Sequence, residues 1–172
     1  MDDVFGENND RNIRFEKWMD EYGTAILRMC IICLLDVGLA DKAMRCTFLK
    51  AYRHMDRYKE PDREKTLLMR VAMRACRRYR FAGWLCRMFR HSAFRHPDLS
   101  LAGMAEQKKI LLQAIMDLPF RYKEVVLISH YQDMAIEDAG KTLHLSRSMV
   151  RFRLKAAKER IRSKLERWYF DE

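Results

Sequence analysis

The cysteines and histidines are the residues of this 172-residue chain whose types could support metal binding or redox chemistry. Cys30 and Cys33 form a C-x-x-C pair, but the pair lies inside an apolar run and no second pair accompanies it. A structural zinc site needs four ligands at matched spacing, and the redox motif needs a strand-to-helix setting. Cys86, His91 and His96 have a spacing that is equally compatible with chance. We therefore expect no metal and no cofactor, and we interpret the cysteines as buried core thiols.

Signatures of catalysis do not emerge either. The five histidines form no recognisable triad, no Gly-rich phosphate loop is found among the six glycines, and no carboxylate pair is placed for acid–base chemistry. An enzyme is therefore the weakest interpretation of the chain, and we expect no catalytic residues.

Basic side chains are concentrated in two segments. Residues 63–95 contain ten Lys/Arg and one acidic residue, a balance of +9, and residues 147–167 contain nine and two, a balance of +7. Residues 1–62, in contrast, contain ten basic and twelve acidic residues, a balance of −2. Most charge runs are solvated helix faces. Two stretches with so few acids favour an extended polyanion as the partner.

The second basic segment has the pattern of a helix-turn-helix, in which the second helix enters the DNA major groove. A short helix is predicted over residues 135–143, followed by the turn His144-Leu145-Ser146 and a long basic helix. Gly140 is small where the two helices approach each other, and Ser146 can cap the second helix. The inward positions of that helix are Val150, Leu154, Ala157 and Ile161. The outward positions, which remain available to DNA, are Arg147, Ser148, Arg151, Phe152 and Lys155.

The elements that must position these residues are predicted to be helical throughout. Only 6 Gly and 3 Pro are present, and alternating strand-like runs are hard to find. Apolar residues at three- and four-residue steps predict helices starting near Ile13, Leu39 and Arg63, with the third ending near Phe81. The first dozen residues are expected to be frayed. We predict an all-α fold of two small helical domains, residues 10–82 and 106–170, joined by a linker over residues 83–105.

Two sets of residues resemble known motifs of extracytoplasmic-function sigma factors. The C-terminal set, which resembles region four, is Leu118-Pro119-x-Arg121-x-x-x-Val125, His130-Tyr131, Glu137-Asp138, Leu143-x-Leu145-Ser146 and Val150-x-x-Arg153-Leu154-x-x-Ala157-Lys158. The N-terminal set, which resembles region two, is Phe15-Glu16, Tyr22-Gly23, Leu27, Asp36, Phe48-Leu49-Lys50-Ala51-Tyr52, Leu68, Arg70, Ala72 and Tyr79. The two sets cover nearly the whole chain in the family's order.

This resemblance implies a bacterial sigma factor that directs core RNA polymerase to promoters, with a region-two bundle of three or four helices and a region-four helix-turn-helix. The implied contacts to the minus-thirty-five element are Ser146, Arg147, Ser148, Arg151, Phe152 and Lys155. Those to the melted minus-ten strand are Tyr58, Arg63, Lys65, Arg74, Arg77 and Arg78. Those to the polymerase clamp are Asp41, Arg45, Phe48, Leu49 and Tyr52. The implied partners are core RNA polymerase, promoter DNA and an anti-sigma factor.

The chain departs from the family pattern at several positions. The clamp-binding helix has Asp41-Lys42-x-x-Arg45-Cys46 in place of an acidic-plus-Gln pattern, and only Asp41 keeps the acidic character. Leu67 replaces a common Trp and Arg74 a frequent Asn. His144 replaces the Gly of the helix-turn-helix, a position that often needs positive φ, which His tolerates better than most side chains.

Two other interpretations remain open. One is a stand-alone helix-turn-helix regulator that binds duplex DNA without polymerase, and the other is a degenerate sigma-like module that only docks on a protein. No signal peptide or long uncharged apolar stretch is found, so we expect a protein of the reducing cytoplasm without membrane insertion.

Overall fold

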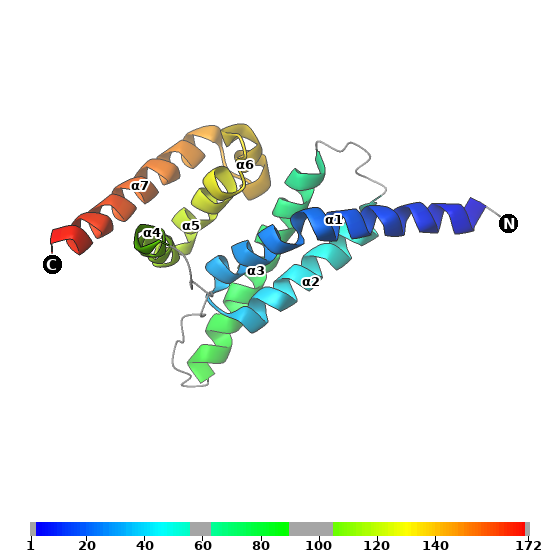
Figure 1. Ribbon diagram of the computed structural model, residues 1–172, viewed down its shortest axis with the longest axis horizontal. Helices are drawn as coiled ribbons and strands as arrows, with labels where there is room; N and C mark the ends of the chain where they lie inside the picture. The colour runs from blue at the N-terminus through cyan, green and yellow to red at the C-terminus, as the bar shows by residue number, and fades with distance from the viewer. Residues whose placement is uncertain (1–2, 56–62, 90–104, 171–172) are drawn as a thin grey trace. The chain divides into compact units, whose positions relative to one another are not determined.

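The computed structural model describes residues 3–55, 63–89 and 105–170, and all regular structure in these ranges is helical. The chain divides into two compact units, Met1–Ala93 and Phe94–Glu172 (Figure 1). The expected all-α architecture with two helical parts is therefore confirmed.

Unit 1 consists of three long helices, α1 (Asp3–Leu34), α2 (Val37–Arg53) and α3 (Glu64–Phe89). Each helix packs against the other two. The core between them takes large apolar side chains from all three, among them Trp18, Ile26, Met29, Phe48, Leu68, Met69 and Met73. Burial of this apolar surface is the main force that holds the three helices together.

A tight turn connects α1 to α2 where the sequence predicts a break. Leu35 takes a left-handed conformation with φ 55°, which ends α1. The Asp36 side chain then caps α2, because its Oδ1 accepts a hydrogen bond from the backbone N–H of Leu39 at 2.8 Å.

Two helix ends differ from the expectations. The α1 helix starts at Asp3 instead of near Ile13. Its early turns contact α2: the Arg11 guanidinium donates to the Tyr52 carbonyl oxygen at 3.1 Å, and the Tyr52 hydroxyl donates to Asn12 Oδ1 at 3.0 Å. The α3 helix continues to Phe89, past the predicted domain end at residue 82, since residues 82–89 contain one Gly and no Pro. The rest of the predicted linker, with His91 and His96, lies outside the described residues.

Buried thiols lie between α1 and α3. Cys30, Cys33 and Cys76 are all buried, and the Sγ atoms of Cys76 and Cys30 are 3.5 Å apart. Hydrogen bonding with Cys30 and Cys33, together with burial, raises the pKa of Cys76 well above its ordinary value. These three are the core thiols that the sequence predicts, whereas Cys46 is half-buried and the Cys86 side chain lies outside the described part. Among the described residues, no group of three or more His, Cys, Asp or Glu side chains is placed to hold a metal ion.

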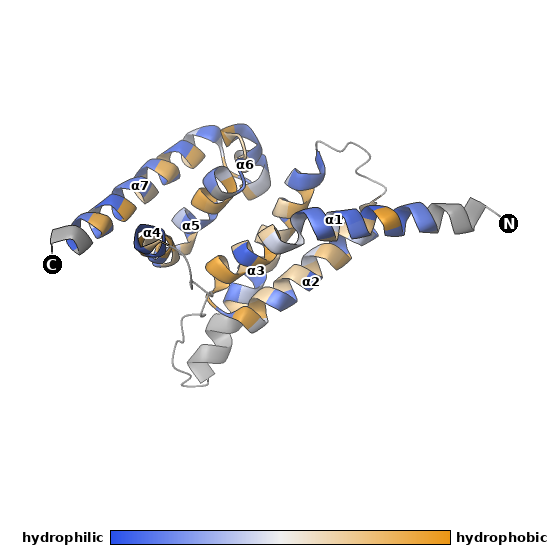
Figure 2. Ribbon diagram, in the orientation of Figure 1, coloured by the Kyte–Doolittle hydropathy of each residue, from blue (hydrophilic) through white to orange (hydrophobic). Residues whose placement is uncertain are grey.

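Unit 2 contains α4 (Glu106–Met116), α5 (Phe120–Val126), a short π-helix η3 (Leu127–Tyr131), α6 (Ile136–Leu143) and α7 (Arg147–Phe170). The α7 helix packs against α4, α5 and α6. Its apolar residues appear as separate segments in an otherwise hydrophilic helix (Figure 2). They join a core made of Leu118, Tyr122, Val126 and Ala157, with Ile115, Leu154, Ala156 and Ile161 packed against it. None of the helices in the described ranges is long and apolar enough to cross a membrane.

Candidate nucleic-acid interface

The turn between α6 and α7 has the geometry that the sequence predicts for a helix-turn-helix. His144 ends α6 in the left-handed conformation, with φ 57° and ψ 46°. The Leu145 N–H donates to the Gly140 carbonyl oxygen at 2.9 Å, which closes the turn. A Cβ atom at Gly140 would lie 2.8 Å from the backbone oxygen of Leu145. Only glycine therefore permits this close approach without a shift of the backbone.

The start of α7 is capped by Ser146, as expected. The Ser146 Oγ accepts a hydrogen bond from the backbone N–H of Met149 at 3.2 Å, and the Ser146 carbonyl accepts from Val150 N–H at 3.0 Å. The Ser148 hydroxyl lies 3.0 Å from that of Ser146. This places two hydroxyl groups and the positive end of the helix dipole at the exposed start of α7, an arrangement that favours anions.

The two faces of α7 have different environments. Val150 and Ala157 are fully buried, while Leu154 and Ile161 pack against the core, so the predicted inward face is confirmed. All six candidate contacts to duplex DNA lie on the exposed face: Ser146, Arg147, Ser148, Arg151, Phe152 and Lys155.

The cations of α7 fall into two groups according to their partners. Arg153 Nη1 lies 2.9 Å from the carboxylate of Glu124, which is buried on α5, so this arginine fastens α7 to the core. Arg147 pairs with Glu137 on α6. Arg151 and Lys155 have no ion-pair partner within the described residues. Unpaired, exposed cations are the ones best placed to neutralise phosphates.

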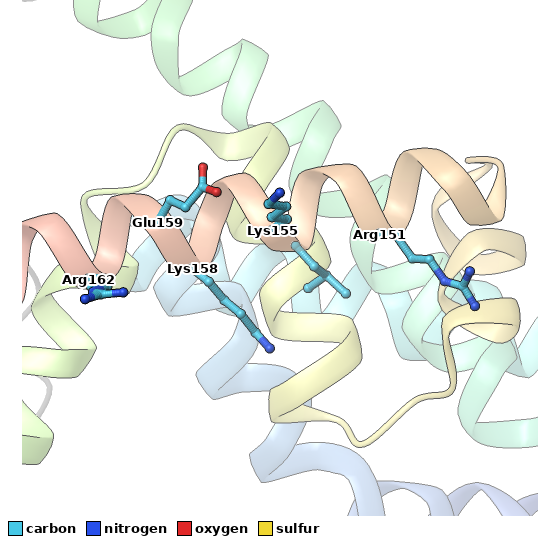
Figure 3. A pocket seen from close by; sticks show the side chains of 6 residues that line it. Arg151, Lys155, Lys158, Glu159 and Arg162 are labelled. Carbon is cyan, nitrogen blue, oxygen red and sulfur yellow. The ribbon is translucent and has the colours of Figure 1, made fainter.

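The exposed cationic stripe extends further along α7 than the predicted set. Arg151, Lys155, Lys158 and Arg162 recur at three- and four-residue steps and line a hollow of about 530 Å³. Arg151 and Lys158 point to one side of the helix in Figure 3, and Glu159 points to the opposite side. The sequence analysis missed Lys158 and Arg162 as candidate contacts, although their spacing from Arg151 was a usable signal. Arg162 is paired with Glu166 at 2.7 Å, whereas Lys158 has no ion-pair partner within the described residues.

In unit 1, the candidate contacts to single-stranded DNA lie mainly along α3. Arg74 and Arg78 are exposed on this helix, and Lys65 and Arg77 are half-buried. Arg63 is exposed just before the helix begins, and Tyr58 lies outside the described residues.

The acidic residue of α3 does not neutralise this basic face. Glu64 is buried, and its Oε1 lies 2.7 Å from Nη2 of Arg14 on α1. Glu64 is the only acidic residue between positions 63 and 95 in the sequence, and its carboxylate is engaged by α1.

The candidate polymerase contacts on α2 are not all accessible. Arg45 is exposed and pairs with Asp41 at 2.9 Å, and Leu49 is 53% exposed. Tyr52 is half-buried against Phe15, with ring centroids 5.3 Å apart. Phe48 is only 2% exposed and belongs to the core, and its assignment as a polymerase contact stays a prediction.

A largely apolar groove of about 410 Å³ runs between α1 and α2 and includes four of these side chains. It is lined by Asn12, Phe15, Met19, Met44, Arg45, Phe48, Leu49 and Tyr52. This contact surface was not predicted from the sequence. One side of the groove belongs to α1, and it can be identified only when the packing of α1 against α2 is known.

Unit 2 matches a known family model, and the chain as a whole is similar to a known protein. Residues 108–161 match the family model described as "Sigma-70, region 4". The ECF RNA polymerase sigma factor SigM of Bacillus subtilis (strain 168) is 23% identical over 155 residues, which cover 88% of this chain and 94% of that protein. The chain is therefore similar to the ECF sigma factors over most of its length, and residues 108–161 match their region 4. Members of this family are regulatory DNA-binding proteins.

Solved structures share the fold of this chain. CnrH, solved in complex with the cytosolic domain of CnrY, has a TM-score of 0.65 and 21% sequence identity, over 88% of this chain and 87% of that chain. The sigma factor RpoE in complex with the anti-sigma factor NepR from Bartonella quintana has a TM-score of 0.67 and 16% identity, over 89% and 97%. The same helical architecture is thus kept at low sequence identity.

Proposed function

We propose that this chain is an ECF sigma factor that directs core RNA polymerase to promoters by reading the minus-thirty-five element with α7. The first turns of α7 carry Ser146, Arg147, Ser148, Arg151, Phe152 and Lys155. The observation that carries the proposal is the pair of exposed cations, Arg151 and Lys155, which have no ion-pair partner in the described part of the chain and lie on the second helix of a region-four helix-turn-helix. In such motifs the start of the second helix contacts base edges, and nearby cations contact phosphates.

Unit 1 is proposed to capture the melted minus-ten strand along α3. Single-stranded DNA is bound by a positive surface that follows its phosphates, together with rings on which bases stack. Arg63, Lys65, Arg74, Arg77 and Arg78 supply the positive charge. Tyr58 and the half-buried Tyr79 are the proposed stacking side chains.

The same unit is proposed to bind polymerase through α2. Asp41, Arg45, Leu49 and Tyr52 form the proposed surface, and Leu49 supplies its most exposed apolar side chain. Asp41 and Arg45 already pair with each other, so their net contribution to a charged partner is small. Polymerase binding should therefore depend more on the apolar groove than on this charged pair.

An anti-sigma factor is proposed to compete for that groove. The solved relative RpoE is bound by the anti-sigma factor NepR, and CnrH by the cytosolic domain of CnrY. A protein that covers Leu49 and the groove beside it would block the surface proposed for polymerase. Leu49→Asp should then weaken both interactions in pull-down assays, whereas Val37→Asp, an exposed apolar position at the start of α2 outside the groove lining, should weaken neither.

In vitro transcription tests the role of α7. Core polymerase is combined with the full chain and genomic fragments, start sites are mapped, and the double variant Arg151→Ala with Lys155→Ala is compared. Two lost DNA contacts of about 1 kcal/mol each predict a fall in promoter binding of roughly thirtyfold, with polymerase association unchanged. Lys109→Ala is the control, because this lysine lies on α4 and pairs with Glu106 at 3.1 Å.

Two outcomes would contradict this assignment of α7. One is loss of polymerase association in the double variant, and the other is unchanged promoter use. Specific duplex binding by the free protein, without any effect on transcription, would instead indicate a stand-alone regulator.

Permanganate footprinting tests the role of α3. The double variant Arg77→Ala with Arg78→Ala should reduce thymine reactivity in the melted segment more than it reduces capture of duplex DNA. Arg28→Ala, which removes an exposed arginine from α1, serves as the matched control. An unchanged footprint in the double variant would contradict the proposed strand capture.

A further inference from the structure

An exposed apolar patch lies within the cationic start of α7. Large apolar side chains that are exposed in the described part of unit 2 are Leu111, Met149 and Phe152, and two of them belong to the first two turns of α7. Phe152 is 64% exposed and Met149 is 41% exposed. They are three residues apart, so they are neighbours on the helix surface.

Phe152 lies at the centre of the outward face. It follows the fully buried Val150 by two residues, which turns its side chain by roughly 200° around the helix axis, away from the core. Ser148 precedes it by one turn and Lys155 follows it by three residues, so polar and cationic side chains lie beside it on this face, together with Met149. Packing inside unit 2 does not account for an aromatic side chain at this position.

The charge around the patch indicates which kind of partner binds it. Arg151 and Lys155 flank Phe152 and have no ion-pair partner in the described residues, and a phosphate backbone would complement them. A phenyl ring pressed into the major groove cannot satisfy the hydrogen-bonding edges of guanine, cytosine or adenine, and burying those edges unpaired is unfavourable. The apolar group that the major groove does offer is the C5-methyl of thymine.

We infer that Phe152, supported by Met149, contacts the methyl group of a thymine in the upstream promoter element and so makes the chain select thymine there. This inference rests on the proposed function of α7 and adds to it the identity of one recognised base. The cationic side chains bind the phosphates of the duplex, while the aromatic ring selects thymine.

The test uses the full chain with core polymerase and duplex probes taken from a mapped promoter. In one probe every thymine of the upstream segment is replaced by deoxyuridine, which removes the methyl groups and keeps the hydrogen-bonding edges. Burying one methyl group contributes a factor of about four in affinity, so the wild type should bind the methyl-free probe about fourfold more weakly. Phe152→Ala should bind the two probes equally. Leu111→Ala, which removes an exposed apolar side chain from α4, should keep the full wild-type ratio.

The possible outcomes distinguish failure of the thymine contact from failure of the proposed function. Equal binding of both probes by the wild type overturns the thymine contact but leaves minus-thirty-five recognition intact. A fourfold ratio that persists in Phe152→Ala assigns the methyl contact to another residue and also overturns the inference. Loss of core polymerase binding in Phe152→Ala makes the ring a protein contact, which overturns it as well. If neither probe is retained by the wild-type holoenzyme, the proposed function itself fails.

Discussion

Replacement of Gly140 by alanine tests whether the close approach of α6 and α7 sets the recognition geometry. The added Cβ would lie 2.8 Å from the backbone oxygen of Leu145, a distance that real Cβ contacts do not show, so the turn must move. Overpacking of this kind costs about 1–3 kcal/mol. Alanine in a helix is favoured over glycine by about 1 kcal/mol, which offsets part of that cost. We therefore expect a net loss of up to about 2 kcal/mol in the stability of unit 2.

Gly23 provides the matched control for this substitution. It lies within α1, and a Cβ there would meet nothing within 4 Å. Gly23→Ala should therefore gain helix stability of about 0.5–1 kcal/mol without any clash. The same chemical change is thus expected to have opposite signs at the two glycines.

Hydrogen–deuterium exchange measured by mass spectrometry separates the two units, which a global melting curve does not. Gly140→Ala should speed exchange in peptides that cover α6 and α7, and it should weaken upstream-element binding by the holoenzyme. Gly23→Ala should slow exchange in α1 and leave DNA binding unchanged. If Gly140→Ala protected α6 and α7 as well as or better than the wild type does, the argument that this turn requires glycine would be refuted.

Four further predictions concern single side chains. His144→Val should destabilise unit 2 by about 1–2 kcal/mol, because a β-branched residue is strained at φ 57°, whereas His144→Asn should change thermal stability little. Arg153→Ala should cost about 2–3 kcal/mol in urea unfolding, since it removes the guanidinium that pairs with the buried Glu124 carboxylate; the 21% exposure of the arginine side chain moderates the loss. Lys158→Ala should make the salt dependence of log K shallower by about 0.9 if this lysine contacts a phosphate, and Arg153→Ala should leave that slope unchanged. In the native protein, iodoacetamide should modify the half-buried Cys46 and not the buried Cys76, because the raised pKa of Cys76 keeps it as the unreactive thiol at neutral pH. Site-resolved mass spectrometry measures the labelling of each cysteine, and equal labelling would contradict the prediction.

The helix-turn-helix was predictable because its signals are local. A small residue at 140, a residue that tolerates positive φ at 144 and a hydroxyl cap at 146 all act within one turn of chain. The inward face of α7 follows from helical period alone. These features need no knowledge of distant contacts, and the structure agrees with the predictions made from them.

The features that sequence reasoning missed depend on contacts between distant residues. The early start of α1 is accompanied by two hydrogen bonds with Tyr52, about forty positions away in the chain: Arg11 donates to its carbonyl oxygen, and its hydroxyl donates to Asn12. Phe48 belongs to a motif that resembles a polymerase contact, but the packing of α1 against α2 buries it. The same packing forms the apolar groove, one side of which comes from α1.

The net charge of α7 overestimates the number of its cations that are available to bind a polyanion. Residues 147–167 contain nine cations, but the sequence alone cannot tell which of them are already paired inside the unit. Arg153 serves the fold, because its partner Glu124 is buried and would be costly to leave alone. Lys164 pairs with Asp117, which follows α4, and so also links α7 to the rest of the unit. Arg151, Lys155 and Lys158, which have no ion-pair partner within the described residues, lie together on one stripe of the helix. The basic run of the sequence therefore contains residues that attach α7 to the rest of the unit and residues that are exposed on its surface.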